Sequence, residues 1–355
     1  MKNTLKKNKT QKVKNKNGNS VIVLILLASL ITGIILFACG CEELLKQPPA
    51  KSPAVDISGQ RQEATRIILE ALADNNDPLV RVNAIEVVAT TEQIRLMPKV
   101  ERLSSDEFVP VRFAVALAIG DLQYAIAEKS LKQLIRDKNP NVRIAASYAM
   151  VKLGRPEYSQ VLLKAITSSD QTVRANAALL LGKTGDKSSL NTLHWALKQK
   201  DSDDKVLFQA AESIAMLGDE QIFPKLWAML ISAYADDRVM GIKAMGLLGT
   251  IKAKNALITM LDDTVLEVRL AAAEQLGALK DTTGEPVVLD VFQKNLTASL
   301  DKYDLRRANM RAALAIGQIG TKSLTKYLPQ LLKDQSKFVR IAAAKAVFQC
   351  TMGKK

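Results

Sequence analysis

The sequence predicts an all-α protein, an α-solenoid of about nine two-helix repeats preceded by an N-terminal hydrophobic signal or anchor helix. A motif that reads roughly V-R-x-x-A-x-x-x-Ψ-G-x-Ψ-G, with Ψ an aliphatic residue, occurs nine times after residue 77. The chain is 48% hydrophobic but only 5% aromatic, which indicates an aliphatic core, and 11 prolines in 355 residues leave room for long helices. A repeated unit that cannot bury its own apolar face is stable only when its neighbours stack on it.

The nine copies keep a nearly constant internal spacing. Three residues after the motif arginine there is an alanine in eight of nine copies, and a large apolar residue follows four positions later. Positions four apart share one face of a helix, so this face combines small and large residues and lets neighbouring helices approach closely. The arginine position is held by Arg81, Arg112, Arg143, Arg174, Leu207, Gly241, Arg269, Asn309 and Arg340.

Each unit is interpreted as a first helix that carries the motif, a turn, a second amphipathic helix and another turn. Glycines at one place after the apolar face predict left-handed C-caps that end the first helices. These glycines are Gly154, Gly185, Gly218 and Gly320. The gap of 40 residues between Arg269 and Asn309, against 31 in most units, predicts a lengthened second helix around residues 286–300.

The two ends of the array are also predicted from the pattern. A helix over residues 60–73 has no first-helix partner in the sequence and is expected to cap the N-terminal end. Nine layers with ordinary helix-packing distances then give a curved rod roughly 80 Å long.

The repeats resemble HEAT repeats, and specifically the short variety found in phycobilin lyases. The clearest copy is V-R-A-N-A-A-L-L-L-G-K-T-G-D at residues 173–186, and the resemblance covers residues 77–355. It implies that the second helices line the concave side. It also implies that the motif arginines bond acids near the turns as a ladder between layers, with Asp77 near Arg81 and Asp170 near Arg174 as candidate pairs. A basic stripe for an anionic ligand is the alternative reading of these arginines.

The N-terminus has a different composition. Residues 1–20 contain seven lysines and no acid, which accounts for half of the net charge of +14, and residues 21–38 carry no charge. A helix of 18 residues spans about 27 Å, close to the thickness of a bilayer core, and the basic flank favours export of the chain on its C-terminal side. The predicted organisation is a basic segment at 1–20, a signal peptide or anchor at 21–41, a linker at 42–57 and the repeat solenoid at 58–355.

The end of the apolar run resembles the lipobox of bacterial lipoproteins, in two registers. L-F-A-C places the lipidated residue at Cys39, and A-C-G-C places it at Cys41. An uncleaved signal anchor with incidental cysteines is the alternative, because the run is longer than a usual signal core. Both readings place the repeats outside the cytoplasm, attached to a membrane of the cell envelope.

The composition and motifs speak against several functions. The remaining positive charge is spread over the repeats, whereas a nucleic-acid binder concentrates it on one element, so no nucleic acid is expected as a partner. His194 is the only histidine. Some HEAT-like oxygenases hold two irons with several His-Glu pairs, and this sequence has no such pair. We therefore expect no metal, no cofactor and no catalytic residues, and interpret His194 as a layer contact.

Three aromatic residues on consecutive second helices are the candidates for partner binding: Trp195, Phe223 and Trp227. On the concave side they would form a binding hot spot, and the alternative is that they fill the core. Lysines on the second helices suggest a basic inner groove or an ordinary solvated face. These are Lys129, Lys132, Lys164, Lys198, Lys225, Lys322 and Lys326, together with Arg136.

The predicted function is a non-catalytic, membrane-tethered scaffold that binds a protein partner at the cell envelope. One alternative is an enzyme that resembles the bilin lyases, because the repeats resemble theirs, although fold does not carry chemistry with it. Another is a binder of an anionic envelope ligand through a basic groove.

Lipid attachment predicts a mature N-terminus at Cys39 or Cys41 that carries a diacylglycerol mass, which mass spectrometry of the membrane-extracted protein measures. The double variant Cys39→Ser, Cys41→Ser is expected to accumulate as an unprocessed precursor. Full-length, unmodified protein in wild-type cells would leave only the uncleaved anchor.

Overall fold

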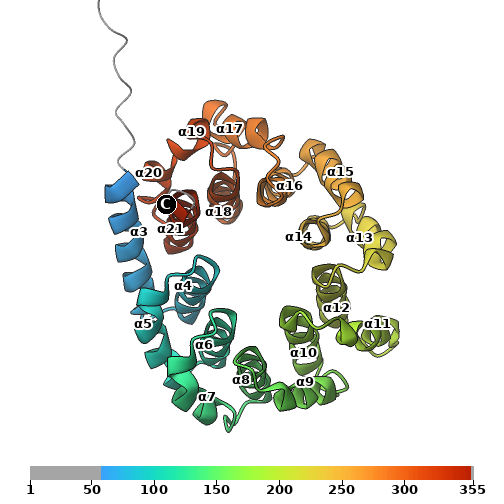
Figure 1. Ribbon diagram of the computed structural model, residues 1–355. Helices are drawn as coiled ribbons and strands as arrows, with labels where there is room; N and C mark the ends of the chain where they lie inside the picture. Colours follow the sequence, from blue (N-terminus) through green and yellow to red (C-terminus); the bar gives the residue numbers. More distant parts are fainter. Residues whose placement is uncertain (1–56, 353–355) are drawn as a thin grey trace, which may run out of the picture. The chain divides into compact units, whose positions relative to one another are not determined.

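The computed structural model describes residues 57–352, and this part of the chain is helical without strands. Its helices form two concentric layers (Figure 1). The inner layer consists of the motif-bearing first helices: α4 (Pro78–Thr90), α6 (Val109–Asp121), α8 (Pro140–Lys152), α10 (Gln171–Thr184), α12 (Asp204–Met216), α14 (Ala235–Leu248), α16 (Leu266–Ala278), α18 (Lys302–Ile319) and α21 (Lys337–Met352). The all-α repeat architecture is therefore confirmed.

The second helices form the outer layer (Figure 1). They are α3 (Ile57–Leu72), α5 (Met97–Arg102), α7 (Glu128–Leu134), α9 (Ser159–Ala165), α11 (Leu190–Lys198), α13 (Phe223–Leu230), α15 (Ile251–Thr259), α17 (Glu285–Gln293), α19 (Lys322–Thr325) and α20 (Leu328–Leu331). Most outer helices are shorter than the inner ones, and several begin with a short 3₁₀ turn. The expectation that second helices line the concave side is wrong, because the first helices surround the centre.

The inner layer is the tighter one because its helices meet through small residues. A Cβ atom built on Gly182 of α10 would lie 2.5 Å from the Cβ of Ser213 on α12. One built on Gly317 of α18 would lie 2.7 Å from the Cα of Ala346 on α21. Such distances exclude a side chain, so the first glycine of the motif allows the inner helices to come closer together than side chains would permit. Closer spacing inside than outside bends every layer in the same direction.

This curvature brings the last inner helix back to the first two helices. Helix α21 packs against α3 and also against α4, so the described helices close into a ring (Figure 1). The predicted open rod is wrong. Nine units that complete a full turn rotate by about 40° each on average.

Helix α3 takes the place of the second helix that α21 lacks in the sequence. Its apolar stripe of Ala64, Ile67, Ile68, Ala71 and Leu72 is buried, which leaves at most 6% of any of these side chains exposed. It is therefore the outer half of the ninth unit and not a cap on an open end.

Polar contacts join the two ends of the ring across the seam, our name for the contact of α21 with α3 and α4. Lys337 Nζ lies 2.5 Å from Asp74 Oδ2, and Lys345 Nζ lies 3.2 Å from Glu86 Oε1. The hydrogen bond from Lys337, helped by backbone N–H groups, holds the pKa of Asp74 below its usual range although burial opposes this.

An arginine–aspartate ladder ties consecutive units together. Arg112 donates from Nε to Asp137 Oδ2 at 2.7 Å and from Nη2 to Oδ1 at 3.1 Å, and Arg238 bonds Asp263 in the same way. Each of these arginines also donates to the carbonyl six residues before it, in its own turn. The ladder predicted from the resemblance is confirmed as an interlayer contact.

The acids predicted for the ladder are wrong. Asp77 and Asp170 instead cap helices, accepting from Leu79 N and Thr172 N respectively. The partner of Arg81 is Asp106 and that of Arg174 is Asp201, both in the next unit. A carboxylate four residues before the arginine is used by its own helix N-terminus and so cannot bridge layers.

The sixth unit has a different register from the one predicted. Its ladder residue is Arg238 and not Gly241, and Gly249, eleven positions after Arg238, adopts φ +63°. With this register the gaps around the sixth unit become 31 residues, as in most units. Gly154, Gly185, Gly218 and Gly320 are confirmed as left-handed C-caps, with φ from +70° to +83°.

The extra residues of the eighth unit do not lengthen a second helix. Helix α17 ends at Gln293, and the insertion forms the connection over 294–301 together with one more turn at the start of α18, which has 18 residues. The prediction of a long second helix over 286–300 is wrong because Asn295 adopts φ +50° and ends the helix there.

No helix within residues 57–352 is long and apolar enough to cross a membrane. The predicted basic segment, the anchor at 21–41 with Cys39 and Cys41, and nearly all of the linker at 42–57 lie outside the described residues.

The ladder predicts an acid-sensitive term in stability. Burial raises the pKa of Asp137, but hydrogen bonds from Arg112 and the Asn139 N–H, with the charges of Arg112 and Arg143, hold it below the ordinary 3.8. A lowered folded-state pKa stabilises above 3.8, and this is lost as pH falls below that value. Arg112→Gln should therefore lower the free energy of unfolding by about 2 kcal/mol at pH 7 and by clearly less at pH 3.

Urea titrations at the two pH values measure this difference. Glu157→Gln, which removes an exposed carboxylate without an ion pair in the described part, is the matched control and should change neither value. An equal loss at both pH values in Arg112→Gln would show that the pair does not carry the term.

Candidate functional site

The aromatic residues predicted for partner binding lie on the outer layer. Phe223 and Trp227 are one turn apart on α13, and their rings stack with centroids 6.3 Å apart and an interplanar angle of 16°. Lys252 of α15 places its ammonium 4.1 Å from the centroid of Phe223, a cation–π contact across two units. Trp195 lies on α11, in the unit before.

Neither tryptophan is a core residue. Each leaves 40% of its surface exposed, while the neighbouring Leu193 and Leu226 are fully buried and fill the space between the layers. Phe223 is partly buried against this core. The structure therefore places the pair Phe223–Trp227 together on the outside of the ring, and no ring contact among the described residues joins Trp195 to it. These three residues are called the outer aromatic cluster below.

The basic inner groove is not formed. The lysines named for it belong to outer helices or to their flanking turns, and Lys132 pairs with Glu128 of its own helix. The inner helices instead carry charges of both signs that pair between neighbouring units. Lys243 binds Glu212 at 2.8 Å, and Arg311 binds Glu274 at 3.2 Å.

His194 makes a layer contact, as predicted. Its Nε2 lies 2.7 Å from Asp219 Oδ2 in the next unit, and the pKa of Asp219 is lowered first by this hydrogen bond and then by the backbone N–H of Gln221. Within residues 57–352 no three His, Cys, Asp or Glu side chains converge in a way that would hold a metal ion.

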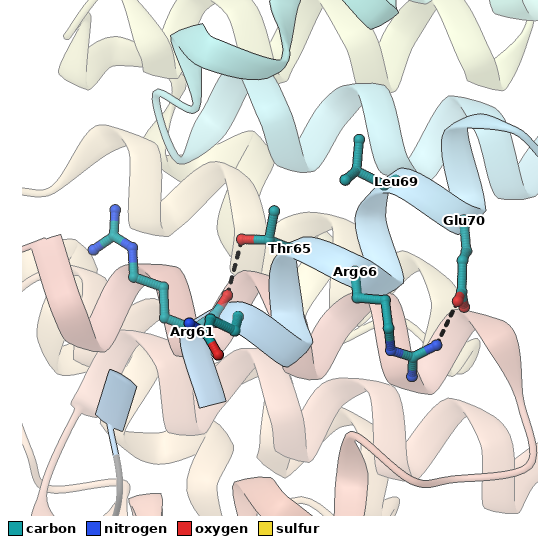
Figure 2. Close-up of a pocket in the computed structure, with 6 residues that line it drawn as sticks. Arg61, Thr65, Arg66, Leu69 and Glu70 are labelled. Carbon is teal, nitrogen blue, oxygen red and sulfur yellow. Dashed lines mark hydrogen bonds and ion pairs between the residues drawn. The ribbon is translucent and has the colours of Figure 1, made fainter. Parts of the chain in front are cut away.

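The outward face of α3 forms a shallow hollow of about 560 Å³ (Figure 2). Its lining side chains all belong to this one helix, and they satisfy one another: Thr65 donates to the Arg61 carbonyl at 2.8 Å, and Arg66 pairs with Glu70 and Glu63. The hydrogen bond to Glu63 is the first cause that raises the pKa of Arg66, followed by that to Glu70. One helix does not enclose a ligand, so this face is interpreted as a solvated surface.

A second hollow, of about 410 Å³, lies at the eighth unit between α17, α18 and α20. Sequence reasoning missed it. Two signals were present in the sequence, the replacement of the ladder arginine by Asn309 and the insertion before it, but the insertion was assigned to a helix.

Comparisons with known proteins agree with the fold. Residues 96–175 and 159–240 match a family model of HEAT repeats. The phycocyanobilin lyase subunit alpha of Picosynechococcus is 31% identical over 160 residues, which cover 42% of this chain and 56% of that protein. Deoxyhypusine hydroxylase of Drosophila melanogaster is 22% identical over 255 residues, or 71% of this chain and 79% of that protein.

An uncharacterized phycocyanin operon protein Z of Pseudanabaena tenuis is 23% identical over 157 residues, 42% of this chain and 78% of its own length. Among solved structures, the phycocyanin lyase complex of Nostoc has a TM-score of 0.41 at 16% identity and covers 70% of this chain and 93% of that chain. The chain thus contains HEAT repeats and has relatives among phycobilin lyase subunits.

Proposed function

We propose that the protein is a non-catalytic scaffold that binds a protein partner through the outer aromatic cluster. The observation that carries the proposal is the stacked pair Phe223–Trp227 with Trp227 40% exposed on the outer layer. Tryptophan is the residue type most enriched where binding energy concentrates, because it buries a large rigid surface at low entropic cost. The stacking and the Lys252 contact hold the Phe223 ring in place before any partner arrives.

The scaffold is proposed to act at the cell envelope, held there by residues 21–41 through a lipid on Cys39 or Cys41 or through an uncleaved anchor. The support is the sequence alone: an uncharged run of 18 residues between a lysine-rich segment and the cysteines.

A partner protein is also favoured by the relatives. One of them is a subunit of a lyase, so its repeats act beside another chain. The same relative favours a second candidate function, a lyase-like activity on a bilin. The 31% identity covers 56% of that protein, and a solenoid of this kind accommodates either role, so attachment of a bilin to an acceptor protein by the purified chain would decide for the second candidate.

Trp227→Ala tests the scaffold proposal. A photo-crosslinking amino acid is placed at Lys225, on the same helix, and the captured partner is identified and then titrated against the purified ring. Loss of a central tryptophan is expected to weaken the affinity at least tenfold. Because this side chain is only partly buried, the thermal midpoint should fall by no more than a few degrees.

Lys225→Ala is the matched control, since it removes an exposed side chain of α13 without touching the ring pair, and it should retain full affinity. Equal affinities for the wild type and Trp227→Ala would refute the assignment of the cluster. A large loss of helical content in Trp227→Ala would assign the side chain to packing instead.

A further inference from the structure

The ladder has one place where the acid remains and the arginine is gone. Five aspartates at equivalent turns each have a cationic partner with N–O distances of 2.5–2.9 Å: Asp74, Asp106, Asp137, Asp201 and Asp263. Asp334 occupies the next such turn, and the residue that faces it from the preceding unit is Asn309, whose Nδ2 donates to Asp334 Oδ2 at 3.2 Å. Within residues 57–352 no cationic side chain forms an ion pair with Asp334.

The shorter asparagine leaves space where other units hold a guanidinium. The hollow of about 410 Å³ at the eighth unit includes both Asn309 and Asp334 in its lining. Its volume lies within the range of sites that take small ligands or single side chains. We call it the ladder pocket.

The rest of the ladder pocket suits a flat cation. Phe292 of α17 and Tyr327, which precedes α20, line it as a stacked pair with centroids 4.2 Å apart and an interplanar angle of 10°. Aromatic faces attract guanidinium groups through their quadrupole. The amides of Asn295 and Gln330 lie at its exposed rim and supply carbonyl oxygens.

We propose that the ladder pocket binds a guanidinium group supplied from outside the ring, which pairs with Asp334 as the motif arginines pair with the other ladder aspartates. Asn309 contributes in two ways. Its Nδ2 already donates to Asp334, and its Oδ1 is left to accept from a ligand N–H. The inference does not rest on the proposed function, because the ladder pocket is in the eighth unit and the outer aromatic cluster is in units four and five.

The chemistry favours a guanidinium over an ammonium. The ladder geometry is bidentate, with two parallel N–H donors on one carboxylate, and a guanidinium presents this fork whereas an ammonium is a point charge. The acceptors around Asp334 are spread over a plane beside an aromatic wall, which matches a flat group with five N–H donors.

The probe is a capped arginine, N-acetyl-arginine amide, titrated into the full-length protein and followed by NMR of side-chain amides. Saturable shifts of the Asn309 and Asn295 amides are expected. The neutral isostere N-acetyl-citrulline amide and the capped lysine should bind at least about tenfold more weakly. Absence of saturable shifts with capped arginine up to 20 mM would overturn the proposal, and so would equal binding of the citrulline probe.

Two variants connect the binding to the ladder. Asp334→Asn keeps the shape and removes the charge, and it should weaken capped arginine at least about tenfold, while Asp262→Asn makes the same charge change at an exposed position and should have no effect. Asn309→Arg restores the ladder from inside. It should abolish binding and raise Tm by about 2–4 °C.

If Asn309→Arg left binding intact, the guanidinium would not occupy the ladder position and the proposal would fail. The source of the group is then read from two further probes, free arginine and a short disordered peptide with one central arginine. Tighter binding of the peptide assigns the site to an arginine of a partner protein, and tighter binding of free arginine assigns it to a small molecule. Both results support the site.

Discussion

The fold depends on the contact between its two ends. The last inner helix, α21, has no second helix after it in the sequence, and it would expose a strip of apolar surface if α3 did not cover it. Helix α3 has the reverse requirement, since it precedes every first helix and carries a buried apolar stripe. Each end therefore satisfies the other, and the ring needs no polar capping repeat of the kind that open solenoids require.

The same constraint explains why the ladder matters. Closure fixes the curvature of every unit, so the distance between neighbouring turns is set, and an arginine of one turn reaches the aspartate of the next with bidentate geometry. Where this pair is broken, the spacing is held by the rest of the ring and the space stays open. The ladder pocket at Asn309 and Asp334 is thus a consequence of a rigid array with one missing side chain.

The sequence predicted the local structure well because the signals are local. The spacing of the alanines and the glycines at 154, 185, 218 and 320 determined the first helices and their C-caps. Closure was missed because it results from a small rotation in every unit, which no single motif encodes. The register of the sixth unit was missed because Gly241 and Gly246 follow Arg238 at spacings that imitate the motif, and the aromatic cluster was placed on the wrong layer because the resemblance, and not the residues, assigned the concave side.

Zero-length crosslinking across the seam tests closure most directly. A carbodiimide joins a carboxylate to an amine only when the two are in contact, so a ring predicts linked peptides that contain Glu86 with Lys345, which lie 3.2 Å apart. Lys243 with Glu212, 2.8 Å apart on neighbouring inner helices, is the internal positive control, and mixed isotope labelling separates bonds within one chain from bonds between chains. The account predicts the Glu86–Lys345 link within single chains. Recovery of the control link without any link across the seam would contradict it.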